Sequence, residues 1–231
     1  MTRPRPPAVW FAEEKPPRKP RLSRERITRA AVALLDADGV EGLTMRRLAA
    51  RLDAGAMSLY EYVGGKEDVL DLAVDEAVAE IGLTGTAGLT WREALTRQLI
   101  ESRRVMRRHP WLPALMSTRP LLGPHALAGS EFFYSLLQGA GLEGPRLTAA
   151  VGSLTYYVQG YAATENSWRT LHRAPDTEAD VRGRAQEYID RRKELYPTLA
   201  RHAELGNDDF DGSFALGLHT ILDGIEAQLG T

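Results

Sequence analysis

Apolar residues recur at intervals of three and four along most of this chain, which is the spacing of one buried helix face. The first stripe comprises Ile27, Ala30, Ala31 and Leu34. It follows Ser23, a residue type that favours the N-cap position. Gly39 comes after the stripe and suits the left-handed conformation that ends many helices. The pattern predicts a first helix that begins at Ser23 and stops at Gly39.

Two shorter helices are predicted next, joined by a tight turn. Thr44 is a second N-cap candidate, and one face of the helix after it is apolar: Met45, Leu48, Ala49 and Leu52. Asp53-Ala54-Gly55 breaks this pattern, and we expect Asp53 to adopt a conformation near the left-handed region. A helix over residues 56–62 is too short to be stable alone, so it must dock through Leu59 and Val63. This arrangement predicts a helix-turn-helix.

The remaining pattern is also helical, and no alternating strand pattern competes with it. Thr90 and Glu93 form a capping-box pattern at the start of a helix that runs to about His109, limited by Pro110 and Pro113. Further helices are predicted over residues 66–81, 124–140, 145–171, 176–202 and 210–229. The expected fold class is all-α, with an N-terminal three-helix helix-turn-helix DNA-binding domain and a larger C-terminal helical domain for ligand binding and dimerisation.

Composition divides the chain into three parts. Residues 1–22 alternate prolines with arginines and lysines, a composition that predicts a disordered basic arm, either lying along DNA phosphates or without a role. Residues 82–88 contain three glycines and predict a flexible connection. The expected domains are therefore residues 23–81 for the helix-turn-helix with its connecting helix, and residues 90–231 for the ligand-binding and dimerisation domain.

The net charge of −2 hides an asymmetry along the 231 residues. Residues 1–66 contain 13 Lys and Arg against 8 Asp and Glu, whereas residues 67–231 contain 16 against 23. A cationic N-terminal part is attracted to a polyanion such as DNA, while an acidic remainder is repelled. The absence of cysteine excludes disulfides and thiolate chemistry, and no apolar run reaches membrane-spanning length. We expect a cytoplasmic, nucleoid-associated protein.

The second and third predicted helices supply the candidate DNA-binding residues. Hydroxyls donate to phosphates or base edges, and a methionine side chain contacts a thymine methyl group. A lysine at the start of the following helix is placed to meet a phosphate. The candidates on these grounds are Met57, Ser58, Tyr60, Tyr62 and Lys66.

The same region resembles the DNA-binding head of the tetracycline-repressor (TetR) family. The resemblance rests on Leu43-Thr44-Met45-Arg46-Arg47-Leu48-Ala49, on Ser58-Leu59-Tyr60-Glu61-Tyr62-Val63 and on Lys66-Glu67-Asp68-Val69-Leu70. It implies that Met45, Arg46, Met57, Tyr60, Tyr62 and Lys66 face DNA. The chain departs from the family pattern in having Asp53 at the turn and Glu61-Tyr62 after Leu-Tyr.

Two of the predicted helices, residues 145–171 and 210–229, are apolar on more than one face, as expected of helices buried from more than one side. A homodimer interface explains this pattern, and a deeply buried helix in a monomer is the alternative. The last helix also resembles the end of a tetracycline-repressor-type C-terminal domain. One short recognition helix discriminates too few base pairs to select a genomic site, so we expect a homodimer on an inverted-repeat operator.

Aromatic and polar residues between His109 and Trp168 are candidates for a ligand cavity. The aromatic candidates are Trp111, Phe132, Phe133, Tyr134, Tyr157 and Tyr161, and the polar ones are His109, Thr118, His125, Glu131 and Gln159. From this set the ligand-binding prediction names His109, Trp111, Thr118, Glu131, Tyr134, Tyr157 and Tyr161. A small-molecule effector of unknown identity that binds there is expected to lower DNA affinity, and a repressor is the reading that the family resemblance favours.

No cofactor and no metal are expected. Ser117-Thr118-Arg119-Pro120 resembles the Gly-Thr-Arg-Pro segment of tetracycline repressors, but Leu115 stands where those proteins have a metal-binding histidine. Leucine cannot coordinate Mg²⁺, which argues against a metal-chelated tetracycline as the effector.

The sequence leaves two other classes of function as alternatives. An all-α enzyme is disfavoured because the five histidines form no metal-ligand spacing and no nucleophile elbow is present. Gly139-Ala140-Gly141-Leu142-Glu143-Gly144 matches a dinucleotide-binding motif, but it follows a helical pattern and predicts a helix-to-helix turn instead. A constitutive or nucleoid DNA-binding protein needs neither a long acidic body nor a cavity. The sequence thus favours a regulator that is not an enzyme.

Overall fold

The computed structural model describes residues 22–83, 87–171, 175–203, 205 and 209–229. These residues form helices and no strands, which confirms the all-α fold class. The basic arm expected over residues 1–22 lies, apart from Leu22, outside the described residues. The helices are α1 (Arg24–Gly42), α2 (Met45–Arg51), α3 (Ala56–Leu59), α4 (Lys66–Ala79), α5 (Trp91–Arg108), α6 (Leu112–Thr118), α7 (Pro124–Gly139), α8 (Gly144–Leu171), α9 (Pro175–Asp190), α10 (Pro197–His202) and α11 (Phe210–Glu226).

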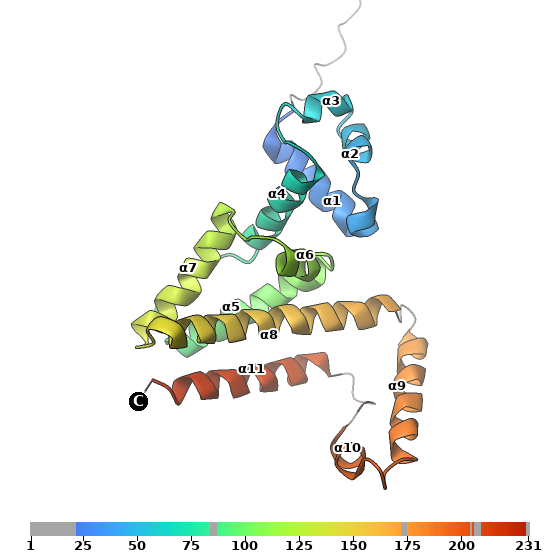
Figure 1. Ribbon diagram of the computed structural model, residues 1–231, viewed down its shortest axis with the longest axis vertical. Coiled ribbons are helices and arrows are strands. Elements are labelled where there is room, and N and C mark those ends of the chain that lie inside the picture. Colours follow the sequence, from blue (N-terminus) through green and yellow to red (C-terminus); the bar gives the residue numbers. More distant parts are fainter. Residues whose placement is uncertain (1–21, 84–86, 172–174, 204, 206–208, 230–231) are drawn as a thin grey trace, which may run out of the picture.

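The helices form a small head and a larger body (Figure 1). We call α1–α3 the head and α5–α11 the body. Helix α4 packs against α1 at one end and against α6 and α7 further along, so it connects the two. In the body α8 packs against α5, α7 and α11. Helix α9 runs downward in this view from the end of α8, and α10 packs at the far end of α9.

Three of the predicted helix starts are confirmed by their capping hydrogen bonds. The Ser23 hydroxyl accepts from the Arg26 amide, and the Thr44 hydroxyl accepts from the Arg47 amide. Thr90 and Glu93 form the complete capping box, because Glu93 also accepts from the Thr90 amide at 2.8 Å. Each cap satisfies a backbone N–H that the first turn of a helix leaves unpaired.

The turn residues also behave as their types predict. Asp53 has φ of +51°, which confirms the left-handed conformation expected between α2 and α3. Gly39 has φ of +68° and interrupts α1, although one more helical turn continues to Gly42. Leu48 of α2 and Leu59 of α3 are both fully buried in the interior of the head.

Two further boundaries and one additional helix differ from the sequence expectation. The third helix ends at Leu59, since the amides of Tyr62 and Val63 both fold back to the Leu59 carbonyl in a tight turn. Residues 176–202 are not one helix: α9 stops at Asp190, and Pro197, which has no amide hydrogen to donate, starts α10. Helix α6 was not predicted, because Pro113 suggested a break, whereas proline fits the first turn of a helix.

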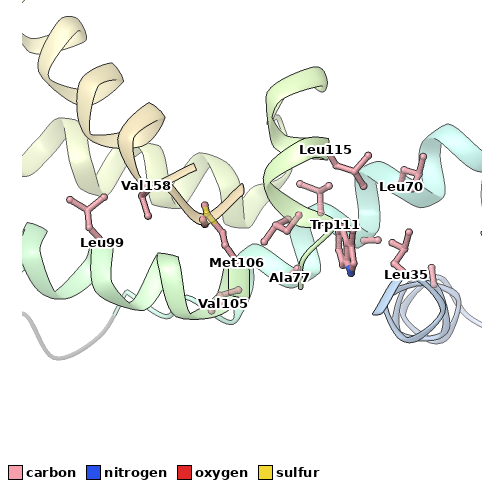
Figure 2. Packing of buried hydrophobic residues seen from close by; sticks show 14 of the residues in the cluster. Leu35, Leu70, Ala77, Leu99, Val105, Met106, Trp111, Leu115 and Val158 are labelled. Atoms are coloured by element: carbon pink, nitrogen blue, oxygen red, sulfur yellow. The ribbon is translucent and has the colours of Figure 1, made fainter. Parts of the chain in front are cut away.

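One buried apolar cluster runs from the head into the body. Figure 2 shows Leu35 of α1 and Leu70 of α4 on one side of Trp111, and Met106 of α5 and Val158 of α8 on the other. Trp111 lies in the short link between α5 and α6 and is buried. The head is therefore packed onto the body through a shared core.

Candidate nucleic-acid interface and ligand cavity

Helices α2 and α3, with the residue that follows α3, present a set of exposed side chains at the end of the head. Met57 is 77% exposed and Tyr60 is 48% exposed, which is unusual for large apolar or aromatic side chains without a partner. Arg46 is also exposed. All three are available to contact a macromolecule, as the sequence analysis expects of DNA-contacting residues.

The other four DNA-binding candidates are only partly accessible. Met45 and Tyr62 are half-buried and pack against the core, and Ser58 is half-buried. The Lys66 ammonium group donates to the Val40 carbonyl at 3.1 Å, which fixes the first turn of α4 against the end of α1. In the structure, Lys66 therefore positions α4.

A cluster of polar side chains joins the head to the body. His109 is 3% exposed, and its Nδ1 lies 2.7 Å from Asp36 of α1 while its Nε2 lies 3.2 Å from Glu80 at the end of α4. Trp111 Nε1 donates to the same Asp36 carboxylate at 2.6 Å. Arg108 completes the cluster through an ion pair with Glu80. These contacts hold α1, α4 and α5 in one relative position.

An apolar cavity lies in the body beside the end of α4. We call it the central cavity; its volume is about 100 Å³. Its walls come from the end of α4, from α5–α8 and from the link between α6 and α7: Val78, Ile81, Leu99, Ser102, Met106, Met116, Leu121, Ala126, Gly129, Ser130, Phe133, Val151, Thr155, Val158 and Gln159. An apolar cavity with a few hydroxyl and amide groups is the usual form of a small-molecule site.

Comparison with known proteins places these features in a family. A family model described as bacterial regulatory proteins, tetR family, matches residues 27–73, which include α2 and α3. A second, described as the tetracyclin repressor-like C-terminal domain, matches residues 84–229. This chain belongs to the tetR family. It is a helix-turn-helix transcriptional regulator, and the family resemblance seen in its sequence is confirmed.

TetR-family relatives resemble the chain along nearly all of its length. An HTH-type transcriptional regulator of Saccharopolyspora erythraea is 43% identical over 97% of this chain and 94% of its own. The HTH-type transcriptional repressor DrrR1 of Streptomyces coeruleorubidus is 38% identical over 94% of this chain and 83% of its own. The crystal structure of the TetR family protein ActR of Streptomyces coelicolor in complex with actinorhodin superposes with a TM-score of 0.82, at 29% identity, covering 92% of this chain and all of ActR.

The sequence of this tetR-family chain predicts seven ligand-binding residues. None of the seven lines the central cavity. His109 and Trp111 belong to the cluster that joins head and body. Thr118 is exposed and donates to the Ala114 carbonyl, and Glu131 is exposed and accepts from Ser135. Tyr134 is half-buried against the core.

Tyr157 and Tyr161 belong to the contact between α8 and α11. Tyr157 donates to the Phe214 carbonyl at 2.9 Å, and Tyr161 donates to the Phe210 carbonyl at 2.8 Å. Burial raises the pKa of both phenols, which keeps both in the protonated form that donates. Both side chains line a shallow hollow on α8 that is separate from the central cavity. Their structural role is to fasten α11 to α8.

Most of the cavity walls could not be found from aromatic and polar residues in the sequence. Of the aromatic and polar candidates between His109 and Trp168, Phe133 and Gln159 do line the cavity. The remaining walls are mostly aliphatic side chains, which have no sequence signature apart from lying on helix faces. The small residues Ala126, Gly129 and Ser130 on one stretch of α7 are the one signal that space is left there.

The described ranges contain no three His, Cys, Asp or Glu side chains that converge on a possible metal position. Leu115, at the position of the metal-binding histidine in the resemblance above, is buried in the apolar core. The same ranges also contain no helix whose length and apolar character suffice to cross a bilayer.

Proposed function

We propose that this protein is a ligand-responsive repressor that binds an inverted-repeat operator as a homodimer and is released by a small molecule in the central cavity. One observation supports this most directly: α4 connects the two sites. Val78 of α4 lines the cavity, and the first residue of the same helix, Lys66, is fastened to α1. A molecule that displaces the end of α4 therefore also displaces the helices that contact DNA.

The energetics of such a switch follow from linkage. A ligand shifts the protein between DNA-binding and released geometries only by its difference in affinity for the two. A change from about 99% to about 1% of the binding geometry requires about 5.5 kcal/mol of differential affinity. At about 0.8 kcal/mol for each buried methylene group, this difference corresponds to burying about seven more methylene groups in the released geometry than in the DNA-binding geometry.

The proposed dimer surface is formed by α8 and α11. Large side chains stand exposed on both helices: Tyr156 is 75% exposed and Leu216 is 71% exposed. On α8, Ser153, Gly160 and Thr164 are also exposed at helical spacing around Tyr156, and small residues let a second helix approach closely. A second copy of the chain would cover these surfaces and set the separation of the two recognition helices.

These sites give each part of the chain a role. Residues 23–81 serve DNA binding, residues 90–231 serve ligand binding and dimerisation, and the basic arm over residues 1–22 adds affinity for phosphates. The protein acts in the cytoplasm at nucleoid DNA and catalyses no reaction. The actinorhodin in the ActR complex supports a drug-sized organic effector, and Leu115 supports an effector that binds without a metal.

The test is an operator release measurement. A duplex is selected from a random library with the full-length protein, and binding is followed by fluorescence anisotropy while a panel of aromatic natural products is added. We expect at least one compound to release the DNA. Val158→Trp, which fills the central cavity, should keep operator affinity but lose the response, whereas Leu127→Trp on the exposed side of α7 should keep both. Equal responses in the two variants would contradict the proposal.

A further inference from the structure

A second cavity shares a wall with the central cavity. This side cavity has a volume of about 220 Å³ and extends toward residues Gln98 and His125. Five residues line both cavities: Val78, Ile81, Ser102, Gly129 and Phe133. The two spaces are therefore neighbours separated by a thin layer of side chains.

Phe133 is the one aromatic side chain among the five residues of this shared wall. Val78 and Ile81 are β-branched and stiff at χ1, and the Ser102 hydroxyl is bonded to the Gln98 carbonyl at 2.8 Å. Gly129 lies four residues before Phe133 on α7, so both face the same side of the helix. Nothing lies within 4 Å of the place where a Cβ at Gly129 would be. The Phe133 ring thus has free space next to it.

The shared wall limits the size of molecule that each cavity can hold. Pockets for drug-sized ligands occupy about 300–1,000 Å³. At about 100 Å³ and about 220 Å³, neither cavity reaches that range alone, but the two together reach its lower end. A drug-sized effector therefore needs both cavities.

The chemistry of the walls limits the class of molecule. Among the described residues, no Asp, Glu, Lys or Arg lines either cavity, so a charged group would be buried there without a partner, which is unfavourable. Polar groups stand in both cavities. Thr155 and Gln159 line the central cavity, and Gln98 and His125 line the side cavity. The Gln98 amide nitrogen donates to the Ile81 and Gly82 carbonyls, which leaves its oxygen free to accept from a ligand.

We propose that Phe133 is a movable partition, and that a single elongated, uncharged and largely apolar molecule occupies both cavities once the ring swings aside. This inference rests on the proposed function of the central cavity as the effector site. Phe133 then determines specificity by the length of the molecule, because short molecules fit one cavity and leave the ring in place.

The test uses two uncharged probes with the full-length protein. 2-Naphthol is short enough for one cavity, and Nile red is an elongated dye that needs both. The variant is Phe133→Ala, and its control is Phe132→Ala, the adjacent ring, which lines neither cavity. We expect Phe133→Ala to tighten Nile red binding by about tenfold, since the ring no longer has to be displaced, and to change 2-naphthol binding by less than about threefold. Phe132→Ala should change neither.

A second variant separates merging of the cavities from simple enlargement. Ala128 lines the side cavity alone, so Phe133→Ala combined with Ala128→Trp refills that space. The gain for Nile red should disappear while 2-naphthol still binds. Anionic 2-naphthoate at pH 7 should bind at least about tenfold more weakly than 2-naphthol, because the described part of the chain places no Lys or Arg against either cavity.

The outcomes distinguish the two proposals. If both probes bind and Phe133→Ala affects them equally, or if Phe132→Ala has the same effect, the partition is wrong while the effector site stands. Tight binding of 2-naphthoate would overturn the uncharged class of ligand. If neither probe binds any folded variant, as judged by an unchanged thermal midpoint, the central cavity is no ligand site and the proposed function fails as well.

Discussion

His109 Nδ1 lies 2.7 Å from the Asp36 carboxylate, although the two residues are 73 positions apart and belong to the body and the head. The opposite ring nitrogen faces Glu80 at the end of α4. Both ring nitrogens therefore lie within hydrogen-bonding distance of a carboxylate. One side chain thus ties together the three helices whose relative positions set the direction of the head.

The first prediction concerns this contact. Asp36→Ala removes the acceptor of both His109 and Trp111 and leaves two buried donors unpaired. The free energy of unfolding should fall by about 1–3 kcal/mol for each unpaired donor, measured by urea denaturation at fixed protein concentration. Glu41→Ala, on the exposed surface near the end of the same helix, should change it by less than about 0.5 kcal/mol. Similar effects of the two substitutions would show that the contact does not stabilise the junction.

The second prediction concerns Glu165 of α8, whose side chain is fully buried. It accepts from Arg103 Nε at 2.9 Å and from Arg169 Nη2 at 2.9 Å, and it pairs with Arg107. Glu165→Ala should lower the free energy of unfolding by about 3–5 kcal/mol, because Arg103 is left as a buried charge without its main partner. Glu101→Ala, which breaks the surface pair with Arg104, should cost less than about 1 kcal/mol. A small effect at Glu165 would contradict the importance of the buried network.

The third prediction is a pH dependence at the start of α5. The Thr90 backbone amide, with its hydroxyl, lowers the pKa of Glu93 below the ordinary value of 4.5. A lowered pKa in the folded state contributes stability that is present above pH 4.5 and is lost as the pH falls through the folded-state value. The difference in unfolding midpoint between the wild type and Glu93→Gln should therefore be largest at neutral pH and shrink on acidification. A difference that stays constant down to pH 3 would contradict the capping contribution.

The fourth prediction concerns the exposed DNA-facing residues. Arg46→Ala should weaken operator binding and lower the salt slope of log K by about one, if Arg46 pairs with a phosphate. Tyr60→Phe should weaken binding by about 0.5–1.5 kcal/mol through the loss of one hydroxyl donor. The control is Arg104→Ala, an exposed arginine in the body. Titrations at several salt concentrations measure both quantities, and an unchanged slope for Arg46→Ala would remove it from the interface.

The sequence predicted local features well because short-range chemistry determines them. Ser23, Thr44 and Thr90 cap helices, and Asp53 takes a left-handed turn, since the relevant partners lie within a few residues. The long-range contacts could not be predicted in the same way. His109 and Trp111 are residue types that often line ligand sites. Their partner Asp36 is on a helix distant in sequence, and nothing in the local pattern indicates that pairing.

The central cavity could not be predicted from the local sequence pattern either. Its walls come from α4–α8, and residues such as Met106 and Val151 look like ordinary core in sequence. Whether aliphatic side chains from several helices meet or leave a space depends on how the helices cross. The aromatic residues that attracted attention, Tyr157 and Tyr161, are instead used to attach α11 to α8.

The central claim is that two copies of α3, held apart by the α8 and α11 surfaces, occupy two half-sites of one operator. Hydroxyl-radical footprinting of the selected operator with the full-length protein tests this most directly. We expect two equivalent protected stretches related by a two-fold axis, with centres about one helical turn or a multiple of it apart. Protection of a single half-site, at protein concentrations that saturate the DNA, would contradict it.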